Sequence, residues 1–119
     1  MPEQSPHLRI AQMASIHIVT MTDRKILDEV NINQIGEQLN GLIAKSAQPK
    51  MVLDFTNVSH MSSSALGMLI LLHKRIRQKN GQLRLCCIQP NIYEVFVITR
   101  LNEILKITST QQESIDSLL

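Results

Sequence analysis

Three consecutive serines stand directly before a strongly apolar run in the segment HMSSSALGMLILLHKRIRQ, residues 60–78. A hydroxyl in this position has three chemical uses: it can cap a helix, act as a nucleophile, or accept a phosphate. A serine cap accepts a hydrogen bond from a free amide of the first helical turn and stabilises a helix by about 1 kcal/mol. One serine is sufficient for this, so Ser62, Ser63 and Ser64 together exceed what capping requires.

The sequence argues against a hydrolytic nucleophile. No glycine precedes the serines as in the G-x-S-x-G elbow, and the S-x-x-K arrangement is absent because Ala65, Leu66 and Gly67 occupy the third places beyond them. A chain of 119 residues also leaves little room for a substrate pocket. We therefore expect that the protein is not an enzyme.

A phosphate acceptor makes use of both the residue type and its position. A helix N-terminus presents unpaired amides and the positive end of the helix dipole, so it tolerates a phosphate. The modification adds about −1.5 to −2 charges. It would change a binding surface sharply while leaving the fold almost unchanged. The residues alone leave capping and phosphorylation open as the role of the serine row.

Hydrophobic patterns along the chain predict strands and helices in alternation. Residues 8–13 and 16–21 are rich in β-branched side chains and indicate two strands, although the turn between them has no Gly or Asn. Apolar residues at helical spacing then predict a helix with Asn31 as its N-cap, ending before Pro49. The remaining predicted elements are a strand at 51–55, a helix at 64–80 that stops at Asn80-Gly81, a strand at 83–88, a helix at 91–100, a strand at 104–108 and a helix at 111–118.

This order predicts a single α/β domain over residues 1–119, with elements β-β-α-β-α-β-α-β-α and a mixed, mostly parallel sheet packed against helices. In open sheets of this kind, functional residues gather beyond the carboxyl ends of the strands, where loops lead into helices. The serine row lies in such a loop, between the strand at 51–55 and the helix at 64–80.

The composition limits the classes of partner. Twelve basic and ten acidic residues give a net charge of +2, and aromatic residues make up 3% of the chain, so nothing indicates nucleic-acid binding. The longest apolar run, residues 65–72, is too short to cross a bilayer. The start, MPEQSPHLRI, lacks the pattern of a secretory signal. We therefore expect a cytoplasmic protein with no insertion into the membrane.

The candidate metal ligands are not grouped in the sequence. Cys86 and Cys87 are the only cysteines, and neighbouring residues on a strand point to opposite faces. We therefore expect the two thiols to be poorly placed to form a disulfide or to bind one metal ion. The four histidines have no metal-ligand spacing either. The sequence thus predicts no metal and no cofactor.

A combination of motifs suggests a family. A strand ends at Asp54, and after a short loop Ser62-Ser63-Ser64-Ala65-Leu66-Gly67 opens a helix; farther on come Gly81, Leu83 to Leu85, Phe96 and Leu101. With these features, from about residue 8 to residue 110, the sequence resembles the STAS domains of the anti-sigma-factor antagonist type. The family usually has Asp-Ser-Ser-Gly-Leu-Gly at the helix start. Here Ser62 stands in place of the Asp and Ala65 in place of the first Gly.

The resemblance implies a protein-interaction switch. Such family members bind an anti-sigma factor that is also a serine kinase; phosphorylation of the first Ser of the pair ends the interaction, and a phosphatase restores it. By position the acceptor here would be Ser63, with Ser62 as the alternative. The implied partner-binding residues are Asp54, Asn57, Met61, Ser62, Ser63, Ser64, Ala65 and Met68. The alternative function is that of a STAS domain that is never phosphorylated and serves as a scaffold, or as a subunit of a transporter or signalling assembly.

Overall fold

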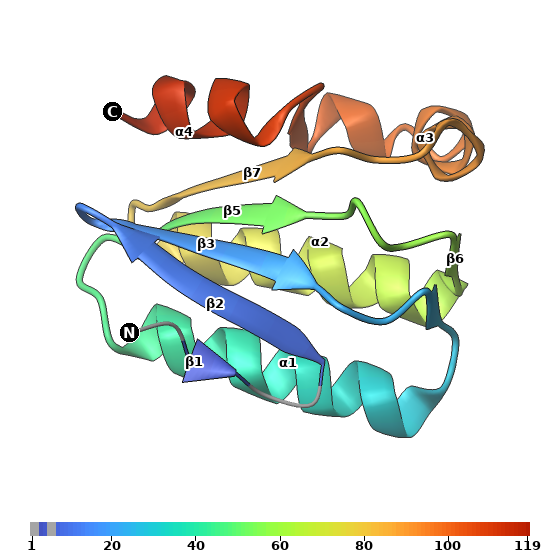
Figure 1. Cartoon of the computed structure of the whole chain (residues 1–119), viewed down its shortest axis with the longest axis horizontal. Helices are drawn as coiled ribbons and strands as arrows, with labels where there is room; N and C mark the ends of the chain where they lie inside the picture. The colour runs from blue at the N-terminus through green and yellow to red at the C-terminus, as the bar shows by residue number, and fades with distance from the viewer. Residues whose placement is uncertain (1–2, 5–6) are drawn as a thin grey trace.

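The computed structural model describes residues 3–4 and 7–119, so residues 1–2 and 5–6 of the expected domain lie outside the described residues. One sheet has the strand order β1-β2-β3-β5-β7-β8 (Figure 1). β1, β2 and β3 pair antiparallel, and β5, β7 and β8 continue the sheet in parallel. The strands are β1 (Glu3–Gln4), β2 (Leu8–Met13), β3 (Ile16–Met21), β5 (Lys50–Asp54), β7 (Gln82–Cys86) and β8 (Lys106–Thr108). The predicted fold class, α/β with a mixed and mostly parallel sheet, is confirmed.

Helices cover both faces of this sheet (Figure 1). They are α1 (Glu29–Ala44), α2 (Ser63–Gln78), α3 (Pro90–Ile98) and α4 (Gln111–Leu118). The larger core lies under α1 and α2, where Leu39 and Leu69 pack with Leu53 of β5. The smaller core lies under α4, where Ile115 packs with Val52 of β5. Side chains alternate between the two cores along β5, because successive residues of a strand point to opposite faces.

The β2–β3 hairpin forms without a turn glycine. Met13 pairs with Ile16, so Ala14 and Ser15 make the turn. Ala14 takes a left-handed backbone with φ 54°. Six register pairs between β2 and β3, with Leu8 and Ile10 buried in the larger core, hold the hairpin together despite this unfavourable turn. The two predicted strands have the bounds that the sequence indicated.

The end of α2 depends on a close approach of two backbones. The amide of Gly81 donates to Ile76 O at 2.9 Å, and Asn80 adopts a left-handed conformation with φ 57°. The next amide, that of Gln82, donates to Pro49 O at 2.9 Å and starts β7 beside β5. The Asn80-Gly81 stop is confirmed, although the helix itself ends at Gln78.

Several predicted boundaries differ from the structure. The first helix begins at Glu29 with Asp28 as N-cap, so Asn31 lies inside the first turn and is not the cap. β7 ends at Cys86 because the left-handed backbone of Cys87 leaves the strand. A short 3-10 helix, η1 (Leu101–Glu103), delays the last strand until Lys106.

A second, two-stranded sheet was not predicted. β4 (Lys25–Ile26) pairs in parallel with β6 (His60–Met61), so the segment before α1 is tied to the segment before α2. The pairing lies at the end of the molecule beyond the carboxyl ends of β3 and β5 (Figure 1). It positions the start of α2 from outside the main sheet.

We expect Gly81→Ala to destabilise the fold by about 3 kcal/mol, because the contact of Gly81 with Pro49 and Ile76 leaves no space for a methyl group. A Cβ at this position would overlap Pro49 O and lie 2.9 Å from Ile76 Cγ2. Urea unfolding followed by circular dichroism measures the change. Gly41→Ala is the matched control: nothing lies within 4 Å of its added Cβ, and in a helix this change should stabilise by roughly 0.5–1 kcal/mol. Equal effects of the two variants would contradict the close-approach argument.

Candidate functional site

The serine row forms the N-terminus of α2, and its three hydroxyls have different surroundings. Ser62 is the N-cap: its side-chain oxygen accepts a hydrogen bond from the Ala65 amide at 3.2 Å. Its own amide donates to Ile26 O at 3.0 Å, which fixes the cap to β4. Ser62 therefore caps the helix, and the hydroxyls of Ser63 and Ser64 take no part in the cap.

Ser63 and Ser64 are both exposed on the first turn of α2. Ser64 Oγ lies 3.4 Å from Glu29 Oε1 of α1, a long hydrogen bond. For Ser63, no hydrogen bond of the hydroxyl is found among residues 3–4 and 7–119. A helix leaves its first amides without intrahelical partners, so the Ser63 hydroxyl stands beside free N–H groups at the positive end of the helix dipole.

The loop from β5 to α2 starts at a buried carboxylate. Asp54 is 6% exposed, and its Oδ1 accepts hydrogen bonds from the amide (2.8 Å) and the hydroxyl of Thr56. Its Oδ2 accepts from Nε2 of Gln111 in α4 at 2.9 Å. Asp54 therefore bonds a loop amide. It points to the α4 side of the sheet and offers almost no surface to a partner.

Backbone hydrogen bonds fix the rest of this loop. The amides of Ser59 and His60 both donate to Arg24 O, at 2.8 and 3.1 Å. The side-chain amide of Asn57 donates to Met21 O at 3.1 Å, which ties the exposed loop to the end of β3. The sequence-predicted site residues Asn57 and Met61 are thus brought to the same end of the sheet as the start of α2.

Two hollows flank the serine row. Ser64 and Met68 line a groove of about 450 Å³ between α1 and α2, together with Leu71, which is 49% exposed. Met61 lines a smaller pocket of about 220 Å³ between the loop and α3, together with Leu27, which is 50% exposed. Both hollows have apolar side chains at their edges.

The predicted partner-binding residues do not all reach the surface. Met61 and Met68 are half-buried against the larger core, and Ala65 is buried completely. Sequence reasoning missed Glu29 and Leu71, which line the groove with Ser64, and Leu27, which lines the pocket with Met61. No local signal could have found Glu29 or Leu27, because their positions depend on the packing of α1 and on the β4–β6 pairing.

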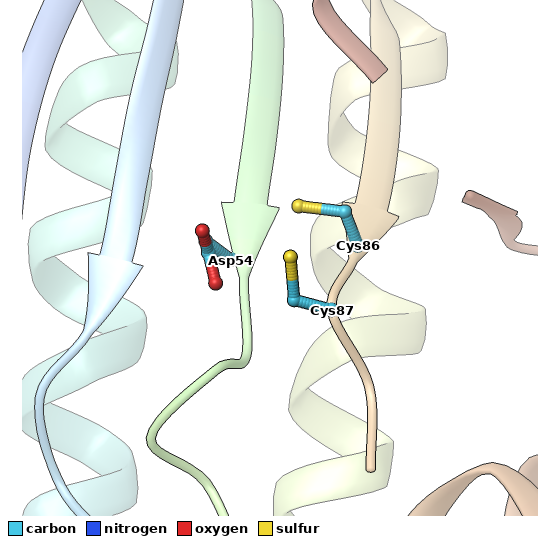
Figure 2. A group of neighbouring side chains, drawn as sticks. All are labelled: Asp54, Cys86 and Cys87. Atoms are coloured by element: carbon cyan, nitrogen blue, oxygen red, sulfur yellow. The ribbon is translucent and has the colours of Figure 1, made fainter. Parts of the chain in front are cut away.

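Two thiols and a carboxylate meet at the ends of β5 and β7 (Figure 2). One ligand atom from each of Asp54, Cys86 and Cys87 lies within 4.8 Å of the others. The expectation that the thiols point apart is wrong, because Cys87 has left the strand with φ 59° and its side chain turns back toward Cys86. Burial, with the charge of Asp54 adding to it, raises the pKa of the Cys86 thiol, which favours its neutral form.

Comparison with known proteins identifies the family of this chain. The STAS domain family matches residues 11–114. The chain belongs to the STAS domain family. A relative named anti-sigma-B factor antagonist, from Listeria monocytogenes, is 27% identical over 92 residues, which is 77% of this chain and 72% of the relative. Its name describes an antagonist of an anti-sigma-B factor.

Solved structures show the same STAS fold. An anti-sigma-factor antagonist (STAS) domain protein from Planctomyces limnophilus has a TM-score of 0.85 and 23% identity, covering 93% of this chain and 97% of that one. The Bacillus cell fate determinant SpoIIAA, in its phosphorylated form, has a TM-score of 0.72 and 18% identity over 94% of this chain and 99% of that one. At these identities the likeness concerns the fold. Within the described part of this STAS domain, none of the helices has the length and apolar character needed to cross a membrane.

The cap assignment gives a stability prediction for this STAS domain. Ser62→Ala removes the acceptor for the Ala65 amide and should cost about 1 kcal/mol, whereas Ser63→Ala should change stability by less than about 0.5 kcal/mol. Ser62→Asp supplies another oxygen acceptor and should keep the stability close to that of the original chain. Urea unfolding of the three variants tests this. If Ser63→Ala proved as costly as Ser62→Ala, the cap would be assigned to the wrong serine.

Proposed function

We propose that this STAS domain is a protein-interaction switch that binds a partner through the start of α2 and the loop before it, and releases it when Ser63 is phosphorylated. The partner is an anti-sigma factor with serine kinase activity, and a phosphatase reverses the modification. The observation that carries the proposal is the free, exposed hydroxyl of Ser63 at the first residue of α2. The name of the Listeria monocytogenes relative and the phosphorylated form of SpoIIAA support it.

The choice of Ser63 over its neighbours rests on hydrogen bonding. Phosphorylation of Ser62 would have to displace the cap bond to Ala65 from a half-buried hydroxyl. Phosphorylation of Ser64 would place a dianion against the Glu29 carboxylate, which Ser64 Oγ already contacts at 3.4 Å. Ser63 has neither obstacle, and a phosphate there faces the free amides of the first turn.

The surface around Ser63 suits a partner that brings apolar side chains. The groove beside Met68 and the pocket beside Met61 can each receive such a side chain, and methionine adapts to irregular surfaces. Ser63 lies in the chain between these two methionines and would be covered by a partner that fills both hollows. A phosphate in such an interface loses its water without gaining a counter-charge. If this cost about 3 kcal/mol, affinity would fall by roughly 100-fold.

The binding test compares charge at two serines. Ser63→Ala should keep the affinity for the kinase-type anti-sigma factor of the same organism. Ser63→Asp should weaken this affinity by about 10-fold to about 100-fold. Ser15→Asp is the matched control: Ser15 is also exposed, but it lies in the β2–β3 turn at the opposite end of the strands. Isothermal titration calorimetry measures all three. Equal affinities of Ser63→Ala and Ser63→Asp would contradict a charge switch at this position.

The acceptor is identified by a separate experiment. Incubation with the same anti-sigma factor and ATP should add one phosphoryl group, and phosphopeptide mapping should place it on Ser63. Ser63→Ala should abolish the addition, whereas Ser64→Ala should leave it in place. Phosphate on Ser62 would keep the switch and correct the acceptor. A chain that binds its partner but is never modified would instead be a scaffold or a subunit of a larger assembly.

A further inference from the structure

The carboxylate of Asp54 is buried without a charged partner. Its three hydrogen-bond donors, the Thr56 amide, the Thr56 hydroxyl and the Gln111 amide, are all neutral. No salt bridge to Asp54 is found among the residues that the structure describes. Buried charges in proteins are normally paired with an opposite charge or coordinate a metal ion. The described residues therefore place no positive charge beside Asp54, and a bound cation would supply one.

The neighbours of Asp54 are two soft ligands. Cys86 is fully buried and Cys87 half-buried, and both sulfur atoms lie within 4.8 Å of a carboxylate oxygen and of one another. Tetrahedral zinc, with Zn–S bonds of about 2.3 Å, would place two thiolate sulfurs about 3.8 Å apart. The sulfur–sulfur separation thus needs to contract by about 1 Å or less, and each sulfur–oxygen separation by roughly 1.3 Å or less, to meet one ion. Side-chain rotation can supply changes of this size.

We propose that Asp54, Cys86 and Cys87 form a binding site for one thiophilic divalent cation of the zinc class. The carboxylate binds through Oδ2, which also accepts the hydrogen bond from Gln111 Nε2, while Oδ1 keeps both hydrogen bonds from Thr56. A water molecule that enters beside the half-buried Cys87 completes four-coordination. Two thiolates favour zinc or cadmium over the hard cations magnesium and calcium, which prefer oxygen ligands.

The binding step balances in charge and protons. Each thiol releases one proton to solvent and forms one metal–sulfur bond, and the carboxylate is already ionised. The divalent ion thus replaces two protons. The site has one net negative charge before binding, from Asp54, and one after it, when three negative ligands surround the ion. The bound ion would join the end of β5 to the end of β7, directly before the loop that leads to the serine row.

The left-handed backbone of Cys87 provides a variant that separates ligand binding from folding. A φ of 59° suits glycine better than cysteine. If residue 87 served the backbone alone, Cys87→Gly would be harmless in every respect. As a metal ligand, Cys87 is required: Cys87→Gly should keep or raise the melting temperature of the metal-free protein and still lose the metal site.

The test uses the full chain, kept reduced, freed of metal with a chelator and then titrated with Zn²⁺ against a chromophoric competitor. We expect one equivalent to bind, with affinity reduced about 100-fold or more in Cys87→Gly and about 10-fold or more in Asp54→Asn. His73→Gln, which removes a half-buried imidazole on α2, should leave the affinity unchanged. Cd²⁺ should produce the ultraviolet charge-transfer band of cadmium–thiolate bonds in the original chain and a much weaker band in Cys87→Gly.

The opposite results would overturn the proposal. Equal zinc affinity in the original chain and in Cys87→Gly would show that the ion binds elsewhere, and a loss in His73→Gln would assign it to surface imidazoles. Absence of the cadmium–thiolate band would exclude the cysteines as ligands. None of these outcomes bears on the phosphorylation of Ser63, since the two proposals rest on different residues.

Discussion

A buried carboxylate at the end of β5 is the constraint on which the loop before α2 depends. An ionised group in a nearly dry environment is stable only when its oxygens are hydrogen-bonded, and Asp54 is 6% exposed. Thr56 satisfies one oxygen and Gln111 the other. To make these bonds the chain must turn immediately after the strand, and α4 must lie over the strand ends. One side chain therefore sets the direction of the loop and joins it to a helix 57 residues farther along the chain.

After this turn, backbone hydrogen bonds fix the position of the chain as far as the serine row. The loop is held by Arg24 O, directly before the short strand β4, and then by Ile26 O, within that strand, before Ser62 caps α2. Because the loop is already ordered, binding a partner there costs little conformational entropy. Because of this order, we expect a phosphate on Ser63 to change the conformation of the loop little. In the proposed switch, phosphorylation would then alter binding through a change in local charge and not through a change of fold.

Local patterns predicted the elements that pack directly on the core. β2, β3 and α4 have the bounds that the sequence indicated, because the spacing of their apolar residues records which face is buried. The cap of α1 was predicted wrongly because Asp28 and Asn31 are both good capping residues, and propensity does not choose between them. The β4–β6 sheet escaped prediction because a strand of two residues has no period to detect.

The site residues likewise divide into those that the local sequence predicted and those that depend on tertiary structure. The serine row and Asp54 were recognisable from residue type and from their place after a buried strand. Cys87 was not, because its position depends on a backbone conformation that few cysteines adopt. Glu29 approaches Ser64 only through the packing of α1 against α2, a contact between residues 35 positions apart. Sequence thus located the loop of the candidate site, and tertiary structure decided which side chains surround it.

Ser62 separates two properties that an aspartate would combine. As an N-cap it provides the oxygen acceptor that α2 needs, and the hydrogen bond to Ala65 shows that this function is kept. It does not provide the negative charge.

Two unit charges about 6 Å apart repel by about 3 kcal/mol at an effective dielectric constant of about 20. An acidic cap next to Ser63 would impose a repulsion of this order on a phosphate, whereas a serine cap imposes none. The nearest carboxylate in contact with the serine row is that of Glu29, on the neighbouring helix. In the proposed switch, the serine cap would therefore lower the electrostatic cost of the phosphorylated form. A kinase that requires an acidic residue before its target serine would recognise this chain less well.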